Sequence, residues 1–113
     1  MKKINSYNEL KTLWETIEDR AINKGSKESY VAFLLEKGVK ECAKKLGEEA
    51  VETSIAAVKL DKKEAIKESA DLLFHLFVLW KSLDLSPQHI IKELEKRKKL
   101  SGLEEKKQRK QIK

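Results

Sequence analysis

The 113-residue chain contains a single cysteine, a single proline and only four glycines. One cysteine excludes an intramolecular disulfide framework and any metal cluster held by several thiolates. Cys42 is therefore expected to be a small apolar group of the core, as free cysteines usually are. With 40% apolar residues, a chain of this length can form one domain around a modest core, and small domains often gain stability by association.

The chain also lacks a long apolar run. Its longest, residues 72–80, is far shorter than the roughly 20 residues that span a bilayer, so a membrane protein is not expected. No apolar signal region follows Met1-Lys2-Lys3. These two features predict a cytoplasmic protein.

Positive charge is unevenly distributed. The formal net charge is +6, but residues 96–113 hold nine basic and two acidic residues, which leaves 16 basic and 17 acidic residues in 1–95. The body is thus close to neutral, and we expect a domain over residues 1–100 followed by a basic, flexible tail over 101–113. Nucleic acid is not an expected partner, because the tail has no aromatic residue to stack on bases. A helical module that binds nucleic acid through this tail would show salt-sensitive binding that disappears when the tail is removed.

Apolar spacing throughout the chain is helical, and no segment alternates as a strand does. Apolar residues between 7 and 21 recur in steps of three and four, and a polar loop follows at 23–29. Gly38 is expected to interrupt a short helix that begins at Tyr30, and a long helix should run from about 39 to 60. Asp61 and Ser86 are expected N-caps of two further helices, the second with Pro87 at its first position. The pattern predicts an all-α protein, an antiparallel bundle of about four to five helices.

Residues 72–80 are apolar around almost the whole helix circumference. A single small bundle can hardly cover such a helix on every side. We therefore expect a homo-oligomer, most simply a dimer, that associates through this central helix.

Carboxylates gather on two neighbouring helices. At about 100 degrees per residue, Glu48, Glu49 and Glu52 share one helix face. The same geometry places a second set of side chains within about 60 degrees on the next helix: Glu64, Glu68, Asp71 and His75. If the two helices pack antiparallel, the two acidic stripes face each other.

Converging carboxylates repel one another unless a cation lies between them. Mg²⁺ prefers oxygen ligands and often bridges carboxylates and substrate phosphates, so the stripes predict a Mg²⁺ site that recruits a polyphosphate. The alternative is a pair of solvated helix faces. It is less favoured because Glu68 and Asp71 immediately precede the apolar run, where unpaired charge is costly. A di-iron site is not expected, because neither His75 nor His89 completes a Glu-x-x-His pair.

Phosphates need positive partners. Lys37, Lys44 and Lys45 lie shortly before the glutamates and are candidates for that role, although solvated lysines are equally compatible with the spacing. Gly47 costs about 1 kcal/mol inside a helix relative to alanine. It either marks the close approach of a ligand or helix, or is simply tolerated.

At these residues the chain resembles the phosphoribosyl-ATP pyrophosphatase family of the all-α nucleotide pyrophosphohydrolases. Glu49-Ala50-Val51-Glu52 is followed by fifteen residues and then by Glu68-Ser69-Ala70-Asp71, which matches the superfamily pattern. The narrower similarity lies in three segments, and the resemblance covers roughly residues 7 to 97: SYVAFLLEKG (29–38), KKLGEEAVE (44–52) and ESADLLFHLFVLW (68–80).

The resemblance implies Mg²⁺-dependent hydrolysis of phosphoribosyl-ATP to phosphoribosyl-AMP and pyrophosphate in histidine biosynthesis. It implies a metal-binding set of Glu48, Glu49, Glu52, Glu68 and Asp71, of which the last four are the catalytic candidates. Which carboxylate takes a proton from the attacking water is left open. Ser29 and Tyr30 would belong to the substrate loop.

The chain departs from the family pattern at Val31 and Phe33, where relatives often have threonine and a polar residue. These departures affect the expected substrate positioning rather than the metal chemistry. The alternative function is that of a house-cleaning nucleoside triphosphate pyrophosphatase of the same superfamily.

Overall fold

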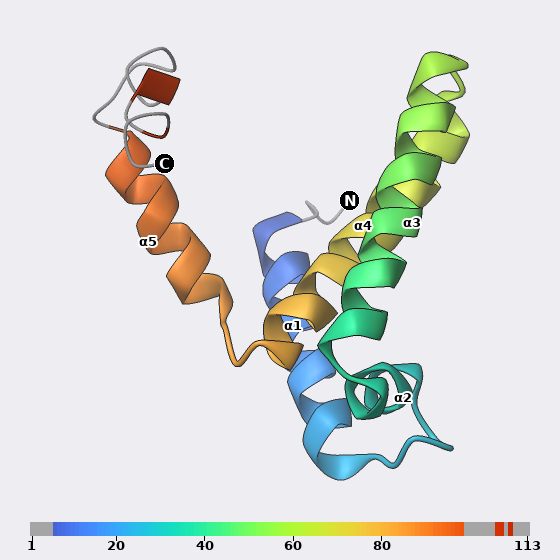
Figure 1. The fold of residues 1–113 in the computed structure, drawn as a ribbon, viewed down its shortest axis with the longest axis vertical. Helices are drawn as coiled ribbons and strands as arrows, with labels where there is room; N and C mark the ends of the chain where they lie inside the picture. Colours follow the sequence, from blue (N-terminus) through green and yellow to red (C-terminus); the bar gives the residue numbers. More distant parts are fainter. Residues whose placement is uncertain (1–5, 99–105, 108, 110–113) are drawn as a thin grey trace, which may run out of the picture.

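Five helices make up the described part of the chain. The structure, a computed structural model, describes residues 6–98, 106–107 and 109, and no strand occurs among them. The helices are α1 (Ser6–Asn23), α2 (Tyr30–Lys37), α3 (Val39–Val58), α4 (Lys62–Ser82) and α5 (Pro87–Arg97). The expected all-α fold is confirmed (Figure 1). Nearly all of the predicted tail, residues 101–113, lies outside the described residues.

Helices α3 and α4 form a long antiparallel hairpin that extends beyond α1 and α2 (Figure 1). The turn between them is tight because Leu60 adopts the left-handed conformation, with φ of 59°. Asp61 then caps α4 as predicted: its carboxylate accepts a hydrogen bond of 3.0 Å from the backbone N–H of Glu64. The hairpin brings the two acidic stripes onto facing helices.

Helix α2 is delimited by its two caps. The Ser29 hydroxyl accepts a hydrogen bond of 3.3 Å from the backbone N–H of Ala32 and so begins the helix. Gly38 ends it with φ of 98°, a conformation that glycine adopts without the cost of a side chain. Because α3 starts directly after Gly38, α2 is held close to the beginning of α3.

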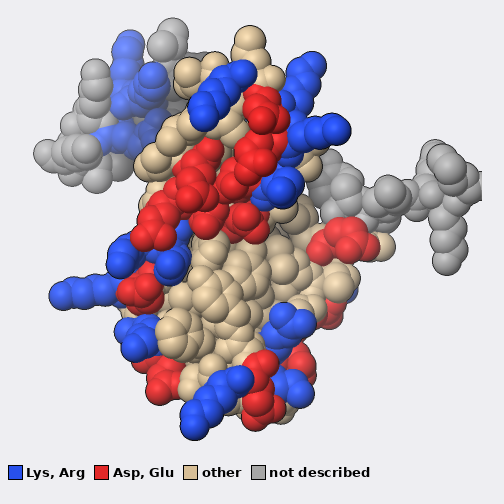
Figure 2. Space-filling view, turned by 90° about the vertical axis from the view of Figure 1, so that its right-hand side faces the viewer, with Lys and Arg blue, Asp and Glu red and all other residues tan. Residues whose placement is uncertain are grey.

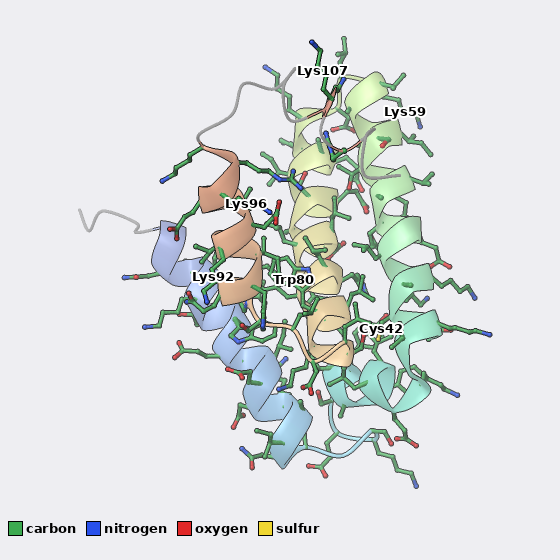
Figure 3. The ribbon with its side chains drawn as sticks, turned by 60° about the vertical axis from the view of Figure 1, so that its left-hand side comes forward. Cys42, Lys59, Trp80, Lys92, Lys96 and Lys107 are labelled. Carbon is green, nitrogen blue, oxygen red and sulfur yellow. The ribbon has the colours of Figure 1, made fainter. Side chains whose placement is uncertain are left out.

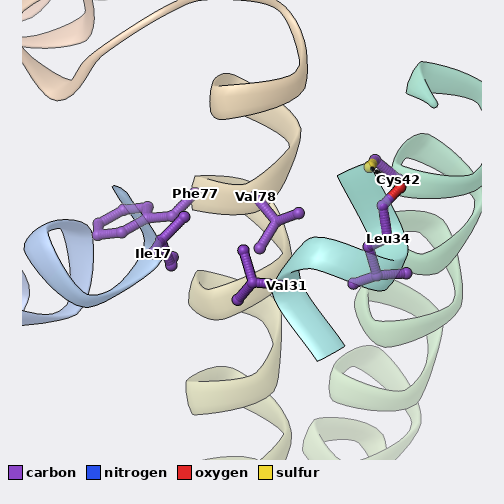
Figure 4. Packing of buried hydrophobic residues seen from close by; sticks show 6 residues of the cluster. All are labelled: Ile17, Val31, Leu34, Cys42, Phe77 and Val78. Carbon is purple, nitrogen blue, oxygen red and sulfur yellow. Dashed lines mark hydrogen bonds between the residues drawn. The ribbon is translucent and has the colours of Figure 1, made fainter. Parts of the chain in front are cut away.

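The core lies where α1, α2, the start of α3 and the second half of α4 meet (Figure 4). Its buried side chains are Ile17, Val31, Leu34, Cys42, Phe77 and Val78. Trp14 packs edge-on against Phe77, with ring centroids 6.1 Å apart. The expectation that Cys42 is buried is confirmed, and its Sγ donates a long hydrogen bond of 3.4 Å to the Leu34 carbonyl. Val31, one of the two departures from the family pattern, belongs to this core and packs against its other apolar side chains.

Helix α5 stands apart from the other four helices in Figure 1, and Figure 3 shows it in a second view with the side chains of Lys92 and Lys96. It begins as predicted with Ser86 and Pro87, and the backbone N–H of Ser86 donates a hydrogen bond of 3.1 Å to Nδ1 of His89. None of its residues is buried, and Ile91 and Leu94 are exposed. Ile91 and Leu94 therefore lack a covering surface within the described chain. None of the described helices has the length and apolar character that crossing a membrane requires.

Candidate active site

Three carboxyl groups from the two helices of the hairpin converge. One carboxylate oxygen each from Glu49 of α3 and from Glu68 and Asp71 of α4 lie within 4.8 Å of one another. The antiparallel packing of α3 and α4 brings them together, because Glu68 and Asp71 are three residues apart and share a helix face. Figure 2 shows the acidic side chains gathered in a band on this side of the molecule.

Two carboxylate oxygens of these residues are buried without a hydrogen-bond partner in the described structure: Oε2 of Glu49 and Oε2 of Glu68. A buried acceptor without a hydrogen-bond partner is unfavourable, and more so when it is charged. An acidic cluster on a solvated helix face would not bury its oxygens in this way. The geometry thus favours the metal-site interpretation over that of two solvated faces.

The neighbouring carboxyl groups change the acidity of Glu68. Its pKa is raised from 4.5 to about 8, first because its carboxyl group can share a proton with that of Glu52, then because of burial. The carboxyl groups of Glu49 and Glu64 add to the effect. Negative charge is therefore disfavoured at Glu68 unless a cation is present. Closely spaced oxygen ligands, two of them buried and unpaired, fit a hard divalent cation such as Mg²⁺.

The remaining predicted metal ligands lie at the rim of this cluster. Glu52 is exposed, and with Glu64 and Glu68 it lines a shallow depression of about 310 Å³ between the two helices. Glu48 is also exposed, and its Oε2 lies 3.5 Å from Nζ of Lys45. Both residues lie outside the group of three converging carboxylates. The metal-binding role of all five predicted ligands stays a prediction. Glu64 belongs to the acidic stripe of the sequence but was not among the predicted ligands.

The three predicted phosphate-binding lysines have different surroundings. The Glu48 carboxylate, whose Oε2 lies 3.5 Å from Nζ, is the main group that raises the pKa of Lys45. Nζ of Lys37 lies 5.5 Å from the centre of the Phe33 ring, and Lys44 is exposed. Of the three, Lys45 is the one with contacts to the acidic helix face.

His75 lies one turn after Asp71 and is buried. Its Nδ1 has no hydrogen-bond partner within the described residues. Burial lowers the pKa of His75, while the carboxylates of Glu49 and Asp71 oppose that shift. Its ring packs edge-on against those of Tyr30 and Phe74, at centroid distances of 5.9 and 5.1 Å. His75 is thus a packed histidine next to the acidic cluster.

Comparison with known proteins identifies the family. Residues 10–98 match the family model of phosphoribosyl-ATP pyrophosphohydrolase. The chain belongs to this family. Over 99 residues it is 50% identical to phosphoribosyl-ATP pyrophosphatase 1 of Bradyrhizobium diazoefficiens, covering 88% of this chain and 92% of that protein. It is 50% identical, again over 99 residues, to phosphoribosyl-ATP pyrophosphatase of Parvibaculum lavamentivorans, covering 87% and 89%.

A further relative is a longer protein, of which this chain matches only a part. The histidine biosynthesis bifunctional protein of Buchnera aphidicola is 47% identical over 96 residues, which cover 85% of this chain but 46% of that protein. The family match and the resemblance drawn from the sequence concern the same stretch. All five helices fall at least partly within it.

Proposed function

We propose that the protein hydrolyses phosphoribosyl-ATP to phosphoribosyl-AMP and pyrophosphate in histidine biosynthesis. The observation that carries this proposal is the convergence of Glu49, Glu68 and Asp71 in a member of the phosphoribosyl-ATP pyrophosphohydrolase family. The reaction breaks the anhydride between the first and second phosphates of the triphosphate chain. Water supplies the new P–O bond, and its proton passes to a base.

Glu49, Glu68 and Asp71 would hold the Mg²⁺ ion, with Glu48 and Glu52 as the further predicted ligands. Bound Mg²⁺ polarises phosphoryl oxygens, lowers the pKa of bound water and offsets the negative charge that develops in the transition state. The carboxylates orient the anhydride and the attacking water between the two helices. One of Glu49, Glu52, Glu68 and Asp71 takes the proton from that water, as a general base does.

Positive side chains next to the carboxylates would complete the phosphate site. Lys45 is the best placed of the three predicted lysines, because Nζ already lies 3.5 Å from Glu48 at the edge of the cluster. Lys44 and Lys37 remain candidates for more distant phosphate groups. Ser29 contributes to substrate binding indirectly, since its cap fixes the start of α2 and hence the position of Tyr30.

Pyrophosphate release from phosphoribosyl-ATP, measured with and without Mg²⁺ beside a panel of ordinary nucleoside triphosphates, tests the proposal. Mg²⁺-dependent release that favours phosphoribosyl-ATP is the expected result. Faster release from an ordinary triphosphate would assign the protein to the house-cleaning pyrophosphatases of the superfamily. No release from any of these substrates would contradict both functions.

We also propose that the protein is a homodimer. The sequence predicted association through residues 72–80, but among them Leu73 is the exposed apolar side chain, so we place the contact on α3 and α5 instead. Apolar residues of α3 face away from the core around a shallow groove of about 440 Å³, lined by Ala50, Val51, Ser54, Ile55, Val58 and Lys59. Helix α5 likewise carries exposed apolar side chains that no described helix covers. In a two-fold symmetric dimer each contact between the two copies occurs twice. If the groove of one copy receives α5 of the other, both surfaces are buried in both copies.

Sedimentation equilibrium tests the dimer. The wild type is expected at twice the monomer mass, and Ile55→Lys, which places a charge in the groove, should shift it toward the monomer. Ile22→Lys, at an exposed site on α1, is the control and should leave the mass unchanged. A wild type that sediments as a monomer contradicts the proposal. The cytoplasmic location stays a prediction from the sequence.

A further inference from the structure

We propose that the rings of Phe33, Tyr30 and Phe74 form a shelf on which the purine base of the nucleotide substrate stacks. We refer to these three residues as the aromatic shelf. The inference rests on the proposed function, because it concerns how that same site holds its nucleotide. It adds a base-binding surface to the carboxylates and lysines that serve the phosphates.

The three rings are nearly parallel although they come from two helices. The Tyr30 ring lies 6.3 Å from the Phe33 ring at an interplanar angle of 16°, and 6.1 Å from the Phe74 ring at 11°. His75 meets the edge of Tyr30 at 89°. Both pairs are stacked, so the three rings form one continuous set of parallel rings, of which Tyr30 and Phe33 leave ring area exposed. The cap at Ser29 and the packing of Val31 hold the Tyr30–Phe33 turn of α2 in place.

Two of the three rings remain open to solvent. Tyr30 is 49% exposed and Phe33 is 40% exposed, whereas each of the other described aromatic side chains is buried or half-buried. Apolar ring surface in contact with water is unfavourable, and a ligand that covers the rings would remove this cost. The flat face of a base covers such rings well, and stacking does not depend on which base is present.

The aromatic shelf adjoins the acidic cluster. Phe74 follows Asp71 by three residues, so it lies on the same helix face about 4.5 Å further along the axis. His75 connects the two features: it follows Asp71 by one turn, and its ring packs edge-on against those of Tyr30 and Phe74 at 5.9 and 5.1 Å. Figure 2 shows an uncharged area directly beside the band of acidic side chains.

This arrangement suits a nucleotide whose phosphates lie at the carboxylates. Its base would extend from the acidic cluster onto the aromatic shelf, and Lys37, 5.5 Å from the Phe33 ring, would add a cation at the outer end. The relatives are named for a substrate that contains adenine, a purine with a large stacking face. Phe33, a departure from the family pattern, would thus extend the stacking surface in this chain.

Phe33→Ala tests the shelf, since Phe33 is exposed and its removal leaves the core intact. KM for phosphoribosyl-ATP is expected to rise about tenfold with kcat changed less than about twofold, because loss of one stacking ring weakens base binding by that order. Phe33→Tyr, which keeps the ring, should restore KM. Ile22→Ala, an exposed apolar side chain on α1, is the matched control and should behave as wild type.

Equilibrium binding separates the shelf from the reaction. In wild type, AMP should show upfield shifts of its adenine H2 and H8 protons on titration with protein, and Phe33→Ala should reduce its affinity about tenfold. Ribose 5-phosphate, which has no base, should bind both proteins alike. If wild type hydrolyses no phosphoribosyl-ATP but AMP binding depends on Phe33, the proposed function fails and the shelf stands.

Three results would overturn the inference. The first is an unchanged KM in Phe33→Ala. The second is an unchanged AMP affinity in that variant, or no shift of the adenine protons with wild type. The third is a shift of the dimer–monomer equilibrium in Phe33→Ala without any effect on nucleotide, which would assign the exposed rings to a contact between protein copies.

Discussion

Binding of Mg²⁺ should release a proton from Glu68. The pKa of this carboxyl group is about 8, first because it can share a proton with the carboxyl group of Glu52, whereas a metal ligand must be ionised. At pH 7 a group with this pKa is protonated in about nine molecules of ten. We therefore expect about 0.9 proton to be released per ion bound at pH 7, and about 0.1 at pH 9.

Titration calorimetry in two buffers of different ionisation enthalpy measures this release, since the difference in heat per mole bound gives the number of protons. Glu68→Gln retains the size of the side chain but has no proton to release. Glu15→Gln, an exposed carboxylate on α1, is the matched control and should release protons as wild type does. Proton release near zero at pH 7 in wild type, or equal release in Glu68→Gln, would refute the reasoning.

The same shift has a consequence for stability without metal. Because the folded-state pKa of about 8 exceeds the ordinary value of 4.5, the folded protein binds this proton more tightly than the unfolded chain does. The free energy of unfolding should therefore fall as the pH rises from 4.5 through 8. Glu68→Gln should remove this part of the fall, and saturating Mg²⁺ should reduce it.

Three substitutions test other parts of the structure. Gly47→Ala should raise the free energy of unfolding by about 1 kcal/mol in urea titrations, because a Cβ at this position would have no neighbour within 4 Å; a loss of stability would mean that this space is occupied. Asp61→Ala should lower it by about 1 kcal/mol through loss of the α4 cap, and an unchanged urea midpoint would contradict that role. Glu52→Gln should abolish turnover, with a melting temperature and helical circular dichroism near or above wild type because one repelling charge is gone; wild-type turnover would remove Glu52 from the site.

Helix boundaries were predictable because the signals that set them are local. Asp61 and Ser86 each lie directly before a helix, and Gly38 ends a helix through its backbone conformation. None of these three signals depends on contacts with residues far away in the chain. The position of α5 was not predictable, because the spacing of Ile91 and Leu94 indicates a helix but does not specify which surface covers it, and no described helix does so. The capping contact of His89 was also missed, since histidine is an uncommon residue at that position.

The acidic cluster was predictable in part. Helical spacing and one tight turn suffice to bring Glu49 opposite Glu68 and Asp71. Spacing alone does not rank the carboxylates, and Glu48 pairs with Lys45 outside the group of three. The aromatic shelf was beyond the reach of the sequence, because the alignment of rings from α2 and α4 follows from the packing of two helices that are far apart in the chain.

The most direct test of the central claim, that the converging carboxylates carry out the hydrolysis, is the turnover of phosphoribosyl-ATP by Asp71→Asn at saturating Mg²⁺. Asp84→Asn is the matched control, because Asp84 is exposed beyond the end of α4 and asparagine tolerates its φ of 62°. Removal of a residue that hydrogen-bonds to a metal ligand typically lowers metal affinity or activity about 10- to 100-fold. Removal of a ligand itself should therefore reduce kcat/KM by more than about a hundredfold. Asp84→Asn should keep wild-type activity. Wild-type turnover by Asp71→Asn would show instead that these carboxylates are solvated helix faces.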